Sequence, residues 1–153
     1  MEQENKMLLI KDLLPRIPYA VHVQHTSGFS GILHNIEIHH MYDENDNIYD
    51  AICYTDFFDD EDNINIEFFK PYLFPLSSMT EEQRNEFLSV AGYEKKEEDC
   101  GRHTENYLYD MVGHENNIYP NYEAIDWLNK NHFDYRNLIE KNLAINATNL
   151  NIY

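Results

Sequence analysis

The sequence predicts an α+β fold, in which an N-terminal antiparallel sheet of about four strands, a meander or a small bent barrel, packs with helices from the C-terminal half. Apolar and polar residues alternate before about residue 70, whereas apolar residues after it recur at helical intervals. A hydrophobic content of 42% with only five Gly and five Pro favours a packed core over disorder. We therefore expect a single domain over residues 1–153, mainly strands over 1–69 and mainly helical over 70–153.

The first half predicts a short helix or turn followed by four strands. Apolar residues around Ile10–Ile17 have helix-like spacing, but Pro15 and Pro18 limit the length of a helix there. The second strand is expected to present Ile32, Ile36 and Ile38 on one apolar face, which His34 shares. The strands are expected at 19–24, 32–39, 48–55 and 64–68, with a polar hairpin tip at 43–47.

The segment after residue 69 predicts a connector and then a capped helix. Residues 70–76 contain two prolines, which indicates an extended connector rather than a central strand. Ser78 or Thr80, with Glu81 or Gln83 three positions later, is typical of a capping box. The helix is expected to run to about Val90, with Phe87, Leu88 and Ala91 toward the core and a left-handed Gly92 after it.

The last third predicts two further helices and a tail. A helix over 122–131 is expected to carry an apolar stripe, with Trp127 as a core anchor. Asp134 is expected to cap a final helix that contains Leu138 and Ile139. Residues 144–153 are expected to be peripheral.

Charge is the strongest compositional signal. Lys and Arg number 11 against 28 Asp and Glu, which gives a formal net charge of −17. Such a surface repels nucleic-acid phosphates and anionic membranes, so we expect neither direct nucleic-acid binding nor a membrane partner. It attracts basic proteins, although acidic surfaces also serve solubility alone.

The chain is expected to reside in the cytoplasm. Its first six residues are polar and acidic, unlike a secretory signal, and no apolar run is long enough for a transmembrane helix. Cys53 and Cys100 lack the spacing of a disulfide framework and are expected to be free thiols.

Four blocks spread along the chain carry a resemblance: 16–19 with 21–23, 31–33, 70–73 with 75–80, and 126–129 through 133–136 to 138–139. They resemble segments of a group of small, uncharacterised proteins encoded by phages and mobile elements of gut bacteria. The sequence departs from the group at Asn137 and Asn142, where glycine is expected, although Asn also tolerates a left-handed backbone. The resemblance implies a cytoplasmic, phage-type context and transfers no catalytic residue.

No motif for catalysis is found in the sequence, which lacks HExxH, G-x-S-x-G and glycine-rich phosphate loops. We therefore expect no cofactor. Histidines near carboxylates nevertheless leave one alternative open, a metal-dependent hydrolase that uses the segment 22–62. Its candidate ligands are His22, His39 and His40.

The segment 17–69 predicts an interaction surface, because it has eleven carboxylates, several aromatic residues and no Lys or Arg. The sequence therefore favours a non-enzymatic accessory or inhibitory protein that binds a basic partner, and a nucleic-acid-mimicking decoy is one form of such a protein. A homo-oligomeric architectural protein is a further alternative. The candidate partner-binding residues are Asp43, Glu44, Asp46, Tyr49, Asp56, Asp59, Asp60, Glu61 and Asp62.

Overall fold

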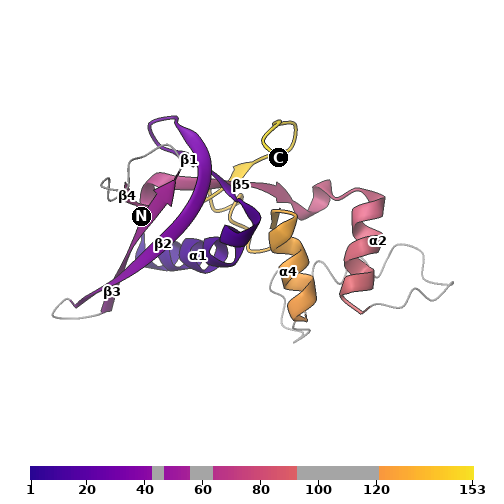
Figure 1. Cartoon of the computed structure of the whole chain (residues 1–153), viewed down its shortest axis with the longest axis horizontal. Helices are drawn as coiled ribbons and strands as arrows, with labels where there is room; N and C mark the ends of the chain where they lie inside the picture. The colour runs from indigo at the N-terminus through magenta and orange to yellow at the C-terminus, as the bar shows by residue number, and fades with distance from the viewer. Residues whose placement is uncertain (43–46, 56–63, 93–120) are drawn as a thin grey trace.

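The computed structural model describes residues 1–42, 47–55, 64–92 and 121–153 and has an α+β fold (Figure 1). Its seven-stranded sheet, counted over the described residues, has the order β4-β3-β2-β1-β5-β6, and β7 also pairs with β5. The expectation of about four strands was therefore wrong. The elements are α1 (Gln3–Leu13), η1 (Leu14–Tyr19), β1 (His22–His25), β2 (Ser30–Tyr42), β3 (Asn47–Thr55), β4 (Ile64–Asn65), η2 (Ile66–Phe68), β5 (Phe69–Pro75), η3 (Leu76–Ser78), α2 (Glu81–Val90), α4 (Tyr122–Lys130), β6 (Phe133–Asp134) and β7 (Ile145–Asn146).

The N-terminal strands form the predicted antiparallel meander, but its fourth strand is short. β1 pairs with β2, and β2 pairs with β3 as far as Tyr42 and Asn47, on either side of the predicted hairpin tip. β4 comprises only two residues, because the chain then turns into the 3-10 helix η2. The Asn65 side chain caps that turn by accepting a hydrogen bond from the Glu67 N–H.

A β-bulge in β2 changes which residues face the core. The register between β2 and β3 shifts between Leu33 and Asn35, so His34 is the extra residue. Leu33 before the bulge and Ile36 after it are both buried as a result, whereas His34 is exposed. The predicted apolar face through Ile32 and His34 was wrong, because the bulge breaks the strict alternation on which it rested. Ile36 is buried as predicted, but Ile38 on the same face is exposed.

β5 is an interior strand of the sheet and pairs with three other strands, contrary to the expectation of a connector. Its first half pairs antiparallel with β1, at Val23↔Pro71. Its second half pairs in parallel with β6, at Pro75↔Asp134, and with β7, at Tyr72↔Ile145. In Figure 1 this strand runs between the N-terminal sheet and the helices α2 and α4.

The prolines of β5 are tolerated because of their position along the strand. The N–H and C=O of one residue point to one edge of a strand, and those of the next residue point to the other edge. The Phe74 N–H donates to the His132 carbonyl just before β6, whereas the Leu73 carbonyl accepts from the Ala147 N–H beyond β7. Pro71 lies an even number of residues from Leu73, so its missing N–H faces the β7 edge and costs no bond to β1.

α1 covers the N-terminal sheet, although the sequence predicted that C-terminal helices would do so. Leu9, Ile10 and Leu13 are spaced along one helix face and are almost fully buried in a cluster with the sheet residues. Pro15 lies in the first turn of η1, where its missing N–H is tolerated, and Ala20 ends η1 with a left-handed backbone (φ 53°).

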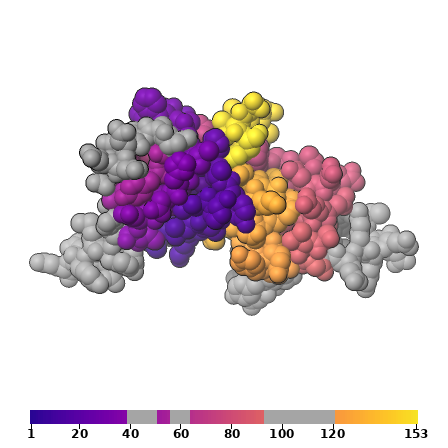
Figure 2. All heavy atoms as spheres, in the orientation of Figure 1, coloured from indigo at the N-terminus to yellow at the C-terminus, as the bar shows by residue number. Residues whose placement is uncertain are grey.

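α2 and α4 pack together and form a second apolar cluster. In Figure 2 the atoms of these two helices lie side by side, on the opposite side of the molecule from the N-terminal strands. The predicted capping box is confirmed, since the Thr80 hydroxyl accepts from the Gln83 N–H and the Gln83 side chain accepts from the Thr80 N–H. Gly92 has the predicted left-handed backbone, with φ 79°. Phe87 is buried as expected, whereas Leu88 is only half-buried.

Trp127 is confirmed as a core anchor and is 7% exposed. Its ring stacks on that of Phe133 with centroids 5.7 Å apart, and the ring of Phe87 lies 5.5 Å away in a tilted arrangement. The cluster therefore holds α2, α4 and β6 together.

Asp134 caps a turn rather than the predicted final helix. Its carboxylate accepts hydrogen bonds from the N–H groups of Arg136, Leu138 and Ile139. Asn137 then adopts a left-handed backbone (φ 58°), as does Asn142 (φ 57°). Left-handed residues interrupt a right-handed helix, so the chain forms successive turns and Leu138 joins the N-terminal core instead.

The segment after residue 143 contributes to the sheet, although a peripheral tail was expected. Its β7 pairs with β5, and Ala147 is fully buried. The Tyr153 hydroxyl donates to the Tyr72 carbonyl (2.8 Å) and accepts from the His22 N–H (3.2 Å). Since His22 and Tyr72 are the next pair in the β1–β5 register, this hydroxyl bridges the two strands where they separate.

Candidate functional site

Most of the predicted partner-binding residues lie outside the described residues. This holds for Asp43, Glu44, Asp46, Asp56, Asp59, Asp60, Glu61 and Asp62. Tyr49 belongs to β3 and is opposite His40 of β2, but its side chain is outside the described part. The candidate binding surface is therefore described through β2 and β3, the strands to which these segments are attached.

The two acidic segments are attached to one β-ribbon, made of β2 and β3. β1 pairs with β2 only at Ser30–Ile32, and β4 pairs with β3 only at Ile52 and Cys53. Among the described strands, the remainder of the ribbon pairs only within itself, as far as Tyr42 and Asn47. Figure 1 shows it extending past α1 and away from the helices α2 and α4.

The side chains that the structure describes on the ribbon include one exposed carboxylate and one exposed apolar residue. Ile38 is 41% exposed, and the Tyr54 hydroxyl donates to the exposed Glu37 carboxylate across the two strands (3.0 Å). No Lys or Arg occurs between residues 17 and 69. The next cation along the chain, Lys70, donates its ammonium hydrogen bond to Asn142 (2.8 Å) on another segment. Nothing in the sequence of the ribbon offsets its negative charge.

Two exposed aromatic residues, which the sequence analysis did not single out, have their backbones bonded to the end of β1. Phe29 is 63% exposed and Phe68 is 44% exposed. Backbone bonds hold both in place, since His25 N–H donates to the Phe29 carbonyl and Thr26 N–H to the Phe68 carbonyl. The His25 ring lies 5.9 Å from that of Phe68. Gly28 permits the tight turn between them with φ 96°.

Of the alternative metal ligands, only His22 has a described side chain. Its ring lies edge-on to that of Tyr153, with centroids 5.3 Å apart. His39 and His40 belong to β2, but their side chains lie outside the described residues. Across the part that the structure describes, no three His, Cys, Asp or Glu side chains are grouped to hold a metal ion.

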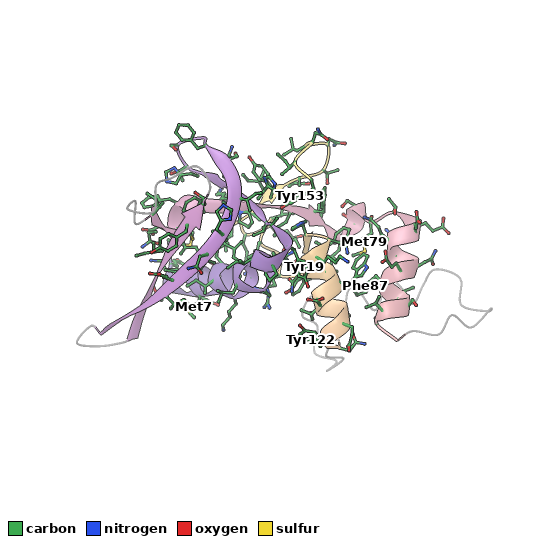
Figure 3. All side chains as sticks on the ribbon, in the orientation of Figure 1. Met7, Tyr19, Met79, Phe87, Tyr122 and Tyr153 are labelled. Carbon is green, nitrogen blue, oxygen red and sulfur yellow. The ribbon has the colours of Figure 1, made fainter. Side chains whose placement is uncertain are left out.

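His132 is a buried histidine that the sequence analysis did not single out. It is 7% exposed, has a left-handed backbone (φ 57°) and stacks on Tyr153 with ring centroids 3.9 Å apart. Burial, with smaller contributions from the charges of Arg16 and His22, lowers the pKa of His132 to about 4. It is therefore neutral at ordinary pH. Figure 3 shows Tyr153 near the junction of the sheet with the two helices.

A buried ion pair joins the two apolar clusters. Arg16 and Asp12 are both fully buried and form two hydrogen bonds, Nε to Oδ2 at 2.8 Å and Nη2 to Oδ1 at 3.0 Å. Arg16 Nη2 also donates to the Phe133 carbonyl (2.8 Å), and the guanidinium lies over the Tyr135 ring. Because the two side chains hydrogen-bond to each other and to the backbone, we interpret the pair as structural rather than catalytic.

A scan against family models, a search of curated proteins and a search of solved structures each found no match to this chain. None of the helices in the described part is long and apolar enough to cross a membrane.

Proposed function

We propose that this chain is a non-enzymatic accessory or inhibitory protein that binds a basic partner protein through the acidic segment 37–67. The observation that carries the proposal is the β2–β3 ribbon, which extends from the body of the fold and lies in a stretch without Lys or Arg. Isolated two-stranded ribbons are marginally stable in water, so docking on a partner offers this one a physical advantage.

The charge distribution supports a protein partner of opposite sign. Charges of one sign raise the local concentration of a basic partner and speed the encounter. A groove that normally holds nucleic acid has this complementary charge, so the proposal includes a decoy that mimics a polyanion. The phage or prophage context that we propose rests on the sequence resemblance alone.

The proposal is tested by capture of host proteins on the immobilised chain, followed by elution with a salt gradient. We expect a basic protein that elutes as salt rises, because screening shortens the reach of the field to ~8 Å at ~0.15 M salt. A fourfold variant with amides at Asp59, Asp60, Glu61 and Asp62 should capture less of it at unchanged melting temperature.

A matched control removes the same number of negative charges from the helices α2 and α4. Glu81, Glu82, Glu86 and Glu123 are exposed residues of α2 and α4, and their replacement by Gln should leave capture nearly unchanged. If both fourfold variants lose capture equally, only the total charge matters and the ribbon is not the site. If capture persists at high salt, the acidic surface serves solubility. Metal content of the purified chain and its mass in solution test the hydrolase and homo-oligomer alternatives.

A further inference from the structure

The side chain of Tyr153 lies where two neighbouring strands of the sheet separate. β1 pairs with β5 as far as Val23↔Pro71, and the pairing ends there. Just beyond that pair, the Tyr153 hydroxyl donates to the Tyr72 carbonyl (2.8 Å) and accepts from the His22 N–H (3.2 Å). The hydroxyl therefore satisfies a backbone acceptor and a backbone donor that the two strands no longer offer each other.

Aromatic rings surround the ring of Tyr153. The imidazole of His132 stacks on it with centroids 3.9 Å apart and planes at 12°, the ring of His22 lies edge-on at 5.3 Å, and that of Phe74 is tilted at 5.8 Å. Burial raises the pKa of Tyr153 to about 12, so the hydroxyl stays protonated and can donate. A flat stacking partner together with a donor and an acceptor at the hydroxyl are the features that recognise a phenol. We call these surroundings of the ring the Tyr153 slot.

The segment that carries this ring, which we call the strap (148–153), is otherwise held loosely. Residues 148–151 are exposed, and in Figures 1 and 2 the strap, in yellow, projects from the body of the molecule. Among the described residues, the N–H groups of Thr148 and Leu150 donate only to residues just before the strap. Exposed segments with local hydrogen bonds open at a low cost in free energy. The Tyr153 side chain is therefore the principal attachment of the strap.

The closed strap leaves a buried polar atom unsatisfied. His132 is 7% exposed, and its Nδ1 has no hydrogen-bond partner among the described residues. Because the Tyr153 ring stacks on this imidazole, removal of the ring exposes one face of it to water. Opening of the strap thus recovers hydration that the closed state withholds from His132, which offsets part of the cost of opening.

We propose that the strap is a releasable plug and that the Tyr153 slot binds a small phenol from solution in its place, so that strap and ligand compete for one site. The hydroxyl of the ligand takes the position between the His22 N–H and the Tyr72 carbonyl, and its ring stacks on His132. A ligand without the hydroxyl binds less tightly, because it covers both backbone groups without pairing them. This inference does not depend on the proposed capture of a basic partner.

The test compares p-cresol, the side chain of tyrosine as a free molecule, with toluene, which lacks the hydroxyl, by NMR of the whole chain. In the unsubstituted chain, p-cresol should shift the ring signals of Tyr153 toward those of an exposed tyrosine. Tyr153→Ala has no ring to displace and should bind p-cresol ~10- to 100-fold more tightly. Toluene should bind that variant ~10-fold less tightly than p-cresol.

A second readout and a matched control locate the ligand. Tyr153→Ala should lose hydrogen-exchange protection at the His22 amide, and p-cresol but not toluene should restore it. Tyr122→Ala, which removes a 79% exposed ring from α4, should bind p-cresol as the unsubstituted chain does.

Three outcomes would overturn the inference. If p-cresol leaves the Tyr153 signals of the unsubstituted chain unchanged at ~100 times its dissociation constant for Tyr153→Ala, the ring is a fixed part of the core and not a plug. Equal binding of toluene would show an apolar cavity rather than a phenol site. If Tyr153→Ala is unfolded, p-cresol should restore its circular dichroism, since a ligand of the native chain alone stabilises it, and failure to do so is the third.

Discussion

His132 combines three features at the scale of one residue: a left-handed backbone, almost full burial and a stacked tyrosine. Its Nδ1 atom is buried and has no hydrogen-bond partner among the described residues. The charged form would have to share this site with Arg16, whose charge further lowers the pKa of His132. The native fold therefore holds this imidazole neutral.

Acidification should consequently destabilise the fold through His132. Between its ordinary pKa of 6.5 and its native pKa of about 4, the unfolded chain binds a proton that the native chain does not. The free energy of unfolding should therefore fall as pH falls through this window, by up to ~3 kcal/mol, and this contribution should level off below it. In the variant His132→Asn, the new residue tolerates the left-handed backbone. Its free energy of unfolding, measured by urea titrations at pH 6.5 and 4.5, should differ less between the two pH values. An unchanged slope would place the acid sensitivity elsewhere.

Cys53 should be unreactive in the folded chain. It is 1% exposed, and burial raises the pKa of its thiol to about 12, so the nucleophilic thiolate is scarce. In a Cys100→Ser background, thiol reagents at pH 8 should modify Cys53 only after denaturant is added. Rapid labelling of the folded variant would show that β3 opens locally.

At the scale of elements, the cluster of α2, α4 and β6 depends on the ring of Trp127. Trp127→Ala should lower the free energy of unfolding by ~3–5 kcal/mol, because it leaves Phe87 and Phe133 without their shared neighbour. Thermal unfolding followed by circular dichroism measures this, since the variant lacks the chain's one tryptophan. Tyr122→Ala on the exposed face of the same helix should cost far less. Equal melting temperatures for the two variants would contradict the assigned packing.

The elements that the sequence predicted correctly are those whose signals are local. The capping box at Thr80 and Gln83 and the left-handed Gly92 depend on neighbouring residues, and both are confirmed. β5 could not be predicted, because the tolerance of its prolines depends on which distant strand pairs with which edge. The bulge at His34 likewise depends on the partner strand, so strict alternation assigned the wrong face.

At the scale of the whole molecule, Arg16 connects the two apolar clusters. Its guanidinium donates to the Asp12 carboxylate of α1 and to the Phe133 carbonyl of β6. The sequence did not indicate that Arg16 is buried, because 28 Asp and Glu offer many candidate partners for one arginine. The negative charge of residues 17–69 can be read from the sequence, whereas the exposure of Phe29 and Phe68 depends on the fold around them.

Arg16→Leu should destabilise the fold by ~3–5 kcal/mol, because it leaves the fully buried Asp12 carboxylate without its principal partner. Arg136, whose Nε lies 3.6 Å from Asp12, offsets only part of that cost. The double variant Asp12→Leu with Arg16→Leu should be more stable than the single one, since it buries no charge. Urea denaturation of four chains, the unsubstituted one, each single variant and the double variant, measures the coupling. A double variant that loses the sum of both single losses would contradict the pairing.

The central claim is that the acidic segment 37–67 captures a basic partner. The association rate constant tests it most directly. Stopped-flow mixing of the chain with labelled oligo-arginine, at salt concentrations where the Debye length shortens from ~30 Å to ~8 Å, measures it. We predict a steep fall with salt, and a shallower one for the variant with amides at residues 59–62 than for the variant with glutamines at 81, 82, 86 and 123. Rates that do not change with salt, or equal slopes for the two variants, would contradict the account.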